Sequence, residues 1–243
     1  MFRLPTICVS FVITLAVSCG GRALLAKEVT FQAGDHMLKA YLNEPKGTGP
    51  FPVVIYLHGG LGPIVAGDPK AVSAAISKLG YIGFAPVRGK NSTIPDNVKE
   101  MMAAIEYVKQ LDNVDSKQMA LVGFSRGGLL AYMASTRRTD LKAFVLMAPA
   151  PGGGALRRFM SDARRVSAPT LLLVAKNDTR QADHVTITQQ LHNTLKAAKK
   201  ESTLIVYPPF GRDGHQLFFQ VRQKHWSDIE KFLKKHLAVD SNP

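Results

Sequence analysis

The chain has 243 residues, of which 46% are hydrophobic and 20% are charged, a composition that excludes a disordered protein. The formal net charge is +13, but the lysines and arginines are scattered, and no basic motif interleaved with aromatic residues accompanies them. We therefore expect no binding to nucleic acid. Both cysteines, Cys8 and Cys19, lie near the N-terminus, so a cysteine nucleophile, a disulfide framework and a thiolate metal site are excluded from the rest of the chain.

The first 26 residues have the pattern of a secretory signal. Arg3 precedes an apolar run from Ile7 to Val17, small residues follow, and we predict cleavage after Ala26. The apolar run is short for a bilayer, so we expect no stable membrane span in the mature chain. An uncut membrane anchor and a lipid anchor at Cys19 stay open as alternatives. The pattern predicts a secreted or periplasmic protein.

The sequence pattern of the remaining chain predicts a single α/β domain over residues 27–243. An antiparallel pair of strands is expected at 27–32 and 36–45. Apolar, β-branched runs then predict six core strands, at 51–60, 81–87, 118–124, 141–149, 169–178 and 202–209. Helical spacing predicts helices at 71–80, 94–111, 126–136, 184–200 and 225–237. Continuous apolar strands separated by helices indicate a mostly parallel central sheet with helices on both faces.

The least regular segment, 150–170, lies between the fourth and fifth core strands. It carries four arginines, Arg157, Arg158, Arg164 and Arg165. These side chains either face a bound anion or coat a short surface helix, and the second outcome is the commoner one. The glycines at 152–154 do not have the spacing of a dinucleotide-binding fingerprint, so we expect no nucleotide cofactor.

The stretch "GFSRGG", residues 123–128, follows a predicted strand and opens a predicted helix. A serine hydroxyl becomes a good nucleophile only when a base removes its proton. In parallel-sheet hydrolases that serine occupies a strained strand-to-helix turn with small residues around it. The context therefore predicts Ser125 as a nucleophile, and the alternative is an ordinary helix N-cap serine.

An attacking serine creates an oxyanion that needs two N–H donors. We predict the backbone N–H of Arg126, directly after the nucleophile, and that of Gly60 in "YLHGGLG" (residues 56–62), which ends the first core strand. A glycine that merely terminates the strand is the alternative for Gly60. His58 is expected to hold this loop through a side-chain hydrogen bond.

The predicted base is His215. Among the seven histidines, it sits just past the sixth core strand, in "PPFGRDGHQLF", where the chain order serine, acid, histidine requires a base. His192, His225 and His236 fall in helical patterns and are expected on the surface.

The acid that orients this histidine is predicted to be Asp178, directly after the fifth core strand. Asp183 is the alternative, but its place before a helix suits an N-cap. Asp213, two residues before His215, is expected to shape the loop.

Four motifs fall in the order found in the α/β-hydrolase superfamily: "HGG" at 58–60, "GFSRGG" at 123–128, "KND" at 176–178 and "GRDGH" at 211–215. From about Lys27 to the last helix, the chain resembles the dienelactone hydrolase-like branch most closely. Dienelactone hydrolases proper carry a cysteine nucleophile, so Ser125 favours ester or peptide-like acyl transfer over dienelactones. The chain is also similar to prolyl oligopeptidase catalytic domains, without their propeller domain.

The sequence therefore predicts a serine hydrolase that cleaves esters of small molecules through a Ser-His-Asp triad and an acyl-enzyme intermediate. We expect neither a cofactor nor a metal, because no metal-binding motif is present. A short serine peptidase and a non-catalytic binding protein on a hydrolase fold are the alternatives.

Overall fold

The computed structural model describes residues 26–62, 67–89, 92–221 and 223–238, so the predicted signal segment lies almost wholly outside the described residues. The strands are β1 Lys27–Ala33, β2 His36–Asn43, β3 Phe51–Leu57, β4 Ile82–Pro86, β5 Val114–Phe124, β6 Ala143–Met147, β7 Thr170–Ala175 and β8 Ser202–Tyr207. The helices are α1 Pro69–Ser77, α2 Ile94–Lys109, α3 Arg126–Ser135, α4 Ala155–Met160, α5 His184–Ala197 and α6 His225–His236. Two short 3-10 segments span Ala163–Arg165 and Gly214–Phe219.

The strands form one sheet in the order β1-β2-β4-β3-β5-β6-β7-β8. β1 and β2 pair antiparallel, as do β2 and β4, and every later pair is parallel. The carboxyl ends of β3, β5, β6, β7 and β8 therefore meet at one edge of the sheet, where open parallel sheets bind their ligands. The predicted fold class is confirmed.

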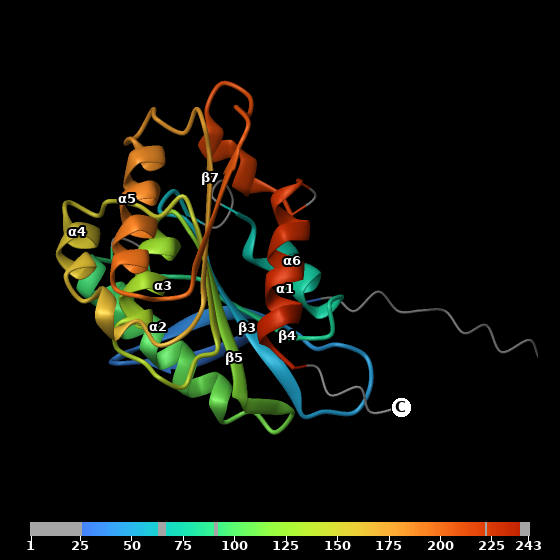
Figure 1. Cartoon of the computed structure of the whole chain (residues 1–243). Helices are drawn as coiled ribbons and strands as arrows, with labels where there is room; N and C mark the ends of the chain where they lie inside the picture. Colours follow the sequence, from blue (N-terminus) through green and yellow to red (C-terminus); the bar gives the residue numbers. More distant parts are fainter. Residues whose placement is uncertain (1–25, 63–66, 90–91, 222, 239–243) are drawn as a thin grey trace, which may run out of the picture.

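Helices cover both faces of this sheet (Figure 1). α2, α3, α4 and α5 lie on one side, and α1 and α6 lie on the other. Alternate residues of β3 supply two cores, because successive strand side chains point to opposite faces. Val53, Ile55 and Leu57 pack with the first group of helices, whereas Val54 and Tyr56 pack with α1 and α6. Both faces of the strand are thus buried, as its continuous apolar sequence predicts.

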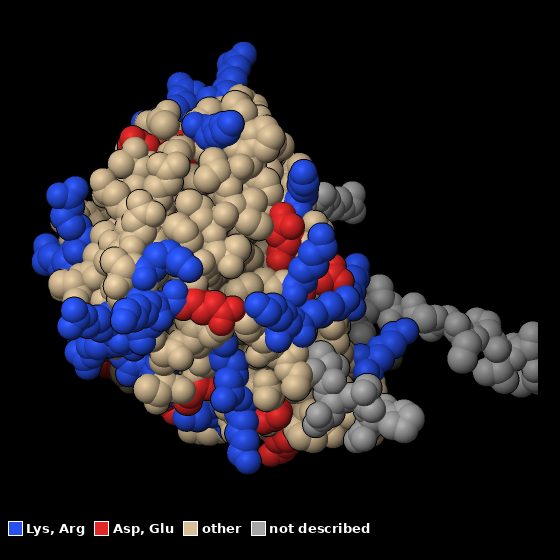
Figure 2. Space-filling view, in the orientation of Figure 1, with Lys and Arg blue, Asp and Glu red and all other residues tan. Residues whose placement is uncertain are grey.

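The segment between β6 and β7 folds as α4 followed by a 3-10 turn, in agreement with the expected short surface helix. Arg157 and Arg158 on α4 are both exposed. On the face drawn in Figure 2, Lys and Arg side chains form several groups that are separated by uncharged surface and by Asp and Glu. Among the described residues, no helix has both the length and the hydrophobicity needed to cross a bilayer.

His225 contradicts one prediction, since it was expected on the surface. It is only 2% exposed, and the ring of Phe218 packs edge-on against it with the centroids 5.1 Å apart. His225 begins the same face of α6 that carries Ile229 and Leu233, four and eight residues later, and both are fully buried. Burial lowers the pKa of His225 to about 4, so the ring is neutral in the folded protein.

We predict that His225→Phe makes stability less sensitive to acid. The unfolded histidine binds a proton near pH 6.5, whereas the folded one does so only near pH 4. Between these values the wild-type protein therefore loses stability as the pH falls, by at most about 1.4 kcal/mol per pH unit from this residue. The free energy of unfolding, measured with urea at pH 7, 6 and 5, should increase in the variant relative to the wild type as the pH falls. A difference that stays constant with pH would contradict neutral burial.

Candidate active site

Ser125 lies where β5 ends and α3 begins. Its φ of 52° and ψ of −113° place it in a backbone region that L-residues rarely adopt. Its N–H donates to the carbonyl of Met147 on β6 at 2.8 Å, and its side chain makes no capping hydrogen bond to α3. The residue occupies the N-cap position of the helix, but its hydroxyl is not used as a cap. This is the strained strand-to-helix turn that the sequence predicts at Ser125.

Glycine is required on both sides of this turn by close packing. A Cβ atom on Gly123 would overlap the backbone of Gly127, and a Cβ atom on Gly127 would overlap the carbonyl of Leu57 at the end of β3. The start of α3 can therefore pack directly against the end of β3. This contact brings the loop that follows β3, with Gly60, next to Ser125.

The structure brings His215 and Asp178 together, although 37 residues separate them in the sequence. The Nδ1 atom of His215 lies 2.9 Å from Oδ2 and 3.1 Å from Oδ1 of Asp178. Both residues are buried, with exposed fractions of 3% and 1%. A carboxylate can only accept, so Nδ1 carries the proton and Nε2 is left as the basic nitrogen.

The other two candidate acids have different roles. Asp183 is exposed and caps α5, where its carboxylate accepts from the N–H of Thr186 at 3.0 Å. Asp213 accepts from the N–H of His215 at 3.2 Å and so shapes the turn that carries the histidine. Asn177 fastens the same loop, because its side chain both donates to the carbonyl of Phe210 and accepts from the N–H of that residue.

His184 is a neighbour of this pair that the sequence did not single out. Its ring stacks on the His215 ring with 4.5 Å between centroids, and its Nδ1 lies 3.3 Å from the carbonyl oxygen of Pro149. Burial lowers its pKa, so it places no second positive charge beside His215.

The nitrogen and oxygen atoms of Asp178, His184 and His215 lie within 4.8 Å of one another. The two rings are tilted by only 35°, however, and imidazole lone pairs lie in the ring plane. Their lone pairs therefore do not converge on one point between the rings, and the stack suits packing better than metal binding.

A cavity of about 260 Å³ opens beside Ser125 and His215. Its lining consists of Gly60, Leu61, Ser125, Arg126, Ala150, Gln181, His215 and Phe219. Four of the five predicted site residues thus border one cavity, and the fifth, Asp178, holds His215 from behind. Arg126 is the first residue of α3, where backbone N–H groups have no partner within the helix.

His58 holds the loop of Gly60 in the manner expected. Its Nε2 accepts from the backbone N–H of Arg88 at 3.2 Å, so the proton sits on Nδ1, which lies 2.9 Å from the carbonyl oxygen of Gly59. Burial and the nearby Arg88 charge lower the pKa of His58 to about 3. The ring of His58 is therefore neutral at physiological pH.

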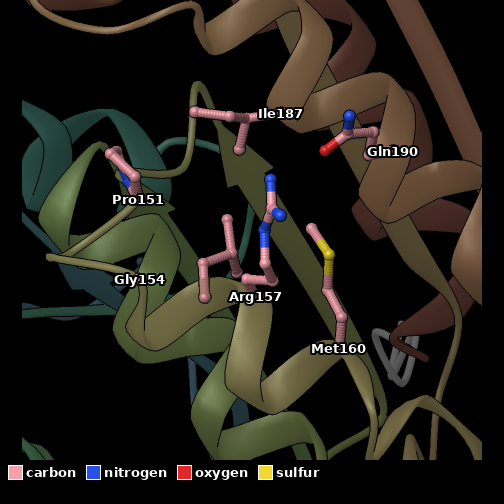
Figure 3. A pocket seen from close by; sticks show the side chains of 7 residues that line it. Pro151, Gly154, Arg157, Met160, Ile187 and Gln190 are labelled. Atoms are coloured by element: carbon pink, nitrogen blue, oxygen red, sulfur yellow. The ribbon is translucent and has the colours of Figure 1, made fainter.

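A second, smaller pocket of about 200 Å³ lies between α4 and α5 (Figure 3). Pro151 lines it, directly after Ala150 of the first cavity. Figure 3 shows the Arg157 side chain extending from α4 into the space between Ile187 and Met160, with Gln190 nearby. Of the four arginines in the segment between β6 and β7, Arg157 thus lines this second pocket, and none lines the cavity beside Ser125.

Known proteins resemble this chain in sequence and in fold. The curated protein "Putative carboxymethylenebutenolidase" of Yersinia pestis is 27% identical to it, with 82% of this chain and 79% of the relative covered. A solved "Putative Dienelactone Hydrolase" from Klebsiella pneumoniae has a TM-score of 0.69 at 17% identity, with 87% of this chain and 98% of that chain covered. Pyrococcus horikoshii acylaminoacyl peptidase has a TM-score of 0.71 at 18% identity, and the match covers 90% of this chain and 42% of that one.

The two structural likenesses show the α/β-hydrolase fold. The family evidence is more specific, because the model of the "Dienelactone hydrolase family" matches residues 87–237. This match spans more than half of the chain and includes Ser125, Asp178 and His215. It confirms the resemblance expected from the sequence motifs, and we conclude that the chain belongs to the dienelactone hydrolase family.

Proposed function

We propose that this protein is a serine hydrolase that cleaves esters of small molecules. One observation carries the proposal. Ser125, which has a strained backbone and a hydroxyl that does not cap α3, borders the same cavity as His215, which is held by Asp178. A nucleophile, a base and a residue that orients the base are the parts that acyl transfer needs.

The chemistry follows from these positions. Ser125 Oγ attacks the ester carbonyl carbon, while Nε2 of His215 takes the hydroxyl proton. The carbonyl oxygen becomes an oxyanion, which accepts hydrogen bonds from the N–H groups of Gly60 and Arg126. The intermediate collapses, the alcohol leaves with the proton from His215, and an acyl-enzyme remains.

A water molecule then attacks the acyl carbon, and His215 takes the proton of that water. The second tetrahedral intermediate collapses, Ser125 recovers its proton from His215, and the carboxylic acid leaves. Throughout, Asp178 holds the Nδ1–H of His215 and stabilises the imidazolium that forms twice in the cycle. The neutral state of His184 matters here, because a positive neighbour would oppose that imidazolium.

The size of the cavity supports a small ester. Its volume of about 260 Å³ is below the roughly 300–1,000 Å³ of pockets that hold drug-sized ligands. A peptide would need a longer groove for the residues that flank its scissile bond. We therefore propose a short acyl group or a small alcohol, and place peptide substrates second.

Ser125→Ala should lower the turnover of a p-nitrophenyl ester by roughly 10⁴-fold or more, because no other group forms the acyl-enzyme. The fold should stay intact, since alanine is no larger than serine, and circular dichroism and thermal unfolding check this. Running p-nitrophenyl acetate beside an aminoacyl p-nitroanilide separates an esterase from a peptidase. A folded variant that kept most of its esterase activity would refute the proposal.

Asp178→Asn should lower kcat by about 10³-fold to 10⁴-fold, because an amide neither fixes the tautomer of His215 nor stabilises its positive form. Asp183→Asn is the matched control, as asparagine also caps helices well and Asp183 makes no contact with His215 in the hydrogen bonds of the described residues. Its kcat should stay within about twofold of wild type. Equal losses in the two variants would contradict the role of Asp178.

A further inference from the structure

Arg88 lies in the loop after β4, behind the loop that carries Gly60. Its guanidinium group donates two hydrogen bonds to that loop. Nη1 lies 2.5 Å from the carbonyl oxygen of His58, and Nη2 lies 2.5 Å from that of Gly59. A charged donor strengthens a hydrogen bond to a carbonyl, and the planar fork of arginine suits two acceptors at once.

The second of these bonds acts on the predicted oxyanion donor. The carbonyl of Gly59 and the N–H of Gly60 belong to the same peptide unit, which is planar and trans, so the two groups point in opposite directions. A guanidinium that holds the Gly59 oxygen on one side therefore fixes the direction of the Gly60 N–H on the other. Gly60 borders the cavity.

The two hydrogen bonds from Arg88 form a clamp on this loop. The loop needs this clamp because two consecutive glycines have unusual backbone freedom. Both lone pairs of the Gly59 oxygen are engaged, one by Arg88 and one by the Nδ1–H of His58. Arg88 is itself anchored, since the N–H of the next residue, Gly89, donates to the buried Glu100 of α2 at 3.3 Å. The direction of the Gly60 N–H is thus tied to a helix of the scaffold.

The Arg88 side chain also places a positive charge next to this loop. Burial and the positive charge of Arg126 lower the pKa of Arg88 to about 10, so the group stays protonated at neutral pH. A cation bonded to a carbonyl polarises the peptide and strengthens the N–H of the same unit as a donor. Arg88 therefore both aims and strengthens the contact that would meet the oxyanion.

We propose that Arg88 is a positioning residue for ester hydrolysis, which directs the Gly60 N–H at the oxyanion of the transition state without touching the substrate. The inference rests on the proposed function. It predicts a loss in transition-state binding rather than in substrate binding, because the oxyanion forms only during the reaction.

The test compares Arg88→Met, Arg88→Lys and the exposed Arg158→Met of α4 as a matched control, with a p-nitrophenyl ester as substrate. In Arg88→Met, kcat should fall about 10²-fold, the scale seen when one oxyanion donor is removed, with KM within about threefold of wild type. The affinity for a trifluoromethyl ketone, which forms a tetrahedral adduct with serine, should fall by a factor similar to that of kcat. The kcat of Arg88→Lys should lie between those of wild type and Arg88→Met, because an ammonium keeps the positive charge but lacks the planar fork that meets both carbonyls. Arg158→Met should match wild type.

Thermal unfolding of each variant separates a folding defect from a catalytic one. If Arg88→Met does not fold, Arg88→Lys decides: a lower kcat at an unchanged Tm supports the inference, and a wild-type kcat overturns it. A folded Arg88→Met with wild-type kcat and inhibitor affinity also overturns it, while Ser125→Ala still shows whether the protein is a serine hydrolase. An inactive wild type, or an active Ser125→Ala, would overturn the proposed function and this inference together.

Discussion

The turn at Ser125 is the constraint on which the site depends. β5 must pass into α3 at one residue with a positive φ, and such a conformation persists only when its surroundings fix it. The N–H of Ser125 donates to the carbonyl of Met147, and its carbonyl accepts from the N–H of Ala150 at 2.9 Å. The end of β6 and the loop after it thus hold both backbone groups of the strained residue. Because Gly127 packs against the end of β3, the same turn also places the loop that carries Gly60.

The charges around the cavity are distributed as acyl transfer requires. On one side a buried carboxylate, Asp178, faces His215, which would become positive. On the other side the guanidinium groups of Arg88 and Arg126 flank the loop of Gly60, where negative charge would develop. Both charge changes of the proposed reaction would therefore meet a fixed charge of opposite sign, already in place before the substrate binds.

Local patterns in the sequence predicted the strands, the turn at Ser125 and the proximity of Asp178 to His215, because apolar runs and glycine spacing are local and parallel strands end at one edge of the sheet. Contacts between distant side chains could not be predicted this way. The clamp formed by Arg88 joins loops about 30 residues apart without a short motif, and the stacking of His184 depends on how α5 is rotated. The wrong placement of His225, in contrast, was avoidable, because its spacing of four and eight residues from Ile229 and Leu233 already indicates the buried face of α6.

Labelling with a fluorophosphonate probe tests the central claim most directly, because such probes react with activated serines and need no knowledge of the substrate. Peptide mass spectrometry of the labelled protein should show one adduct per chain, on Ser125, and Ser125→Ala should remain unlabelled. An unmodified Ser125 in folded wild-type protein, or an adduct on another residue, would contradict the account.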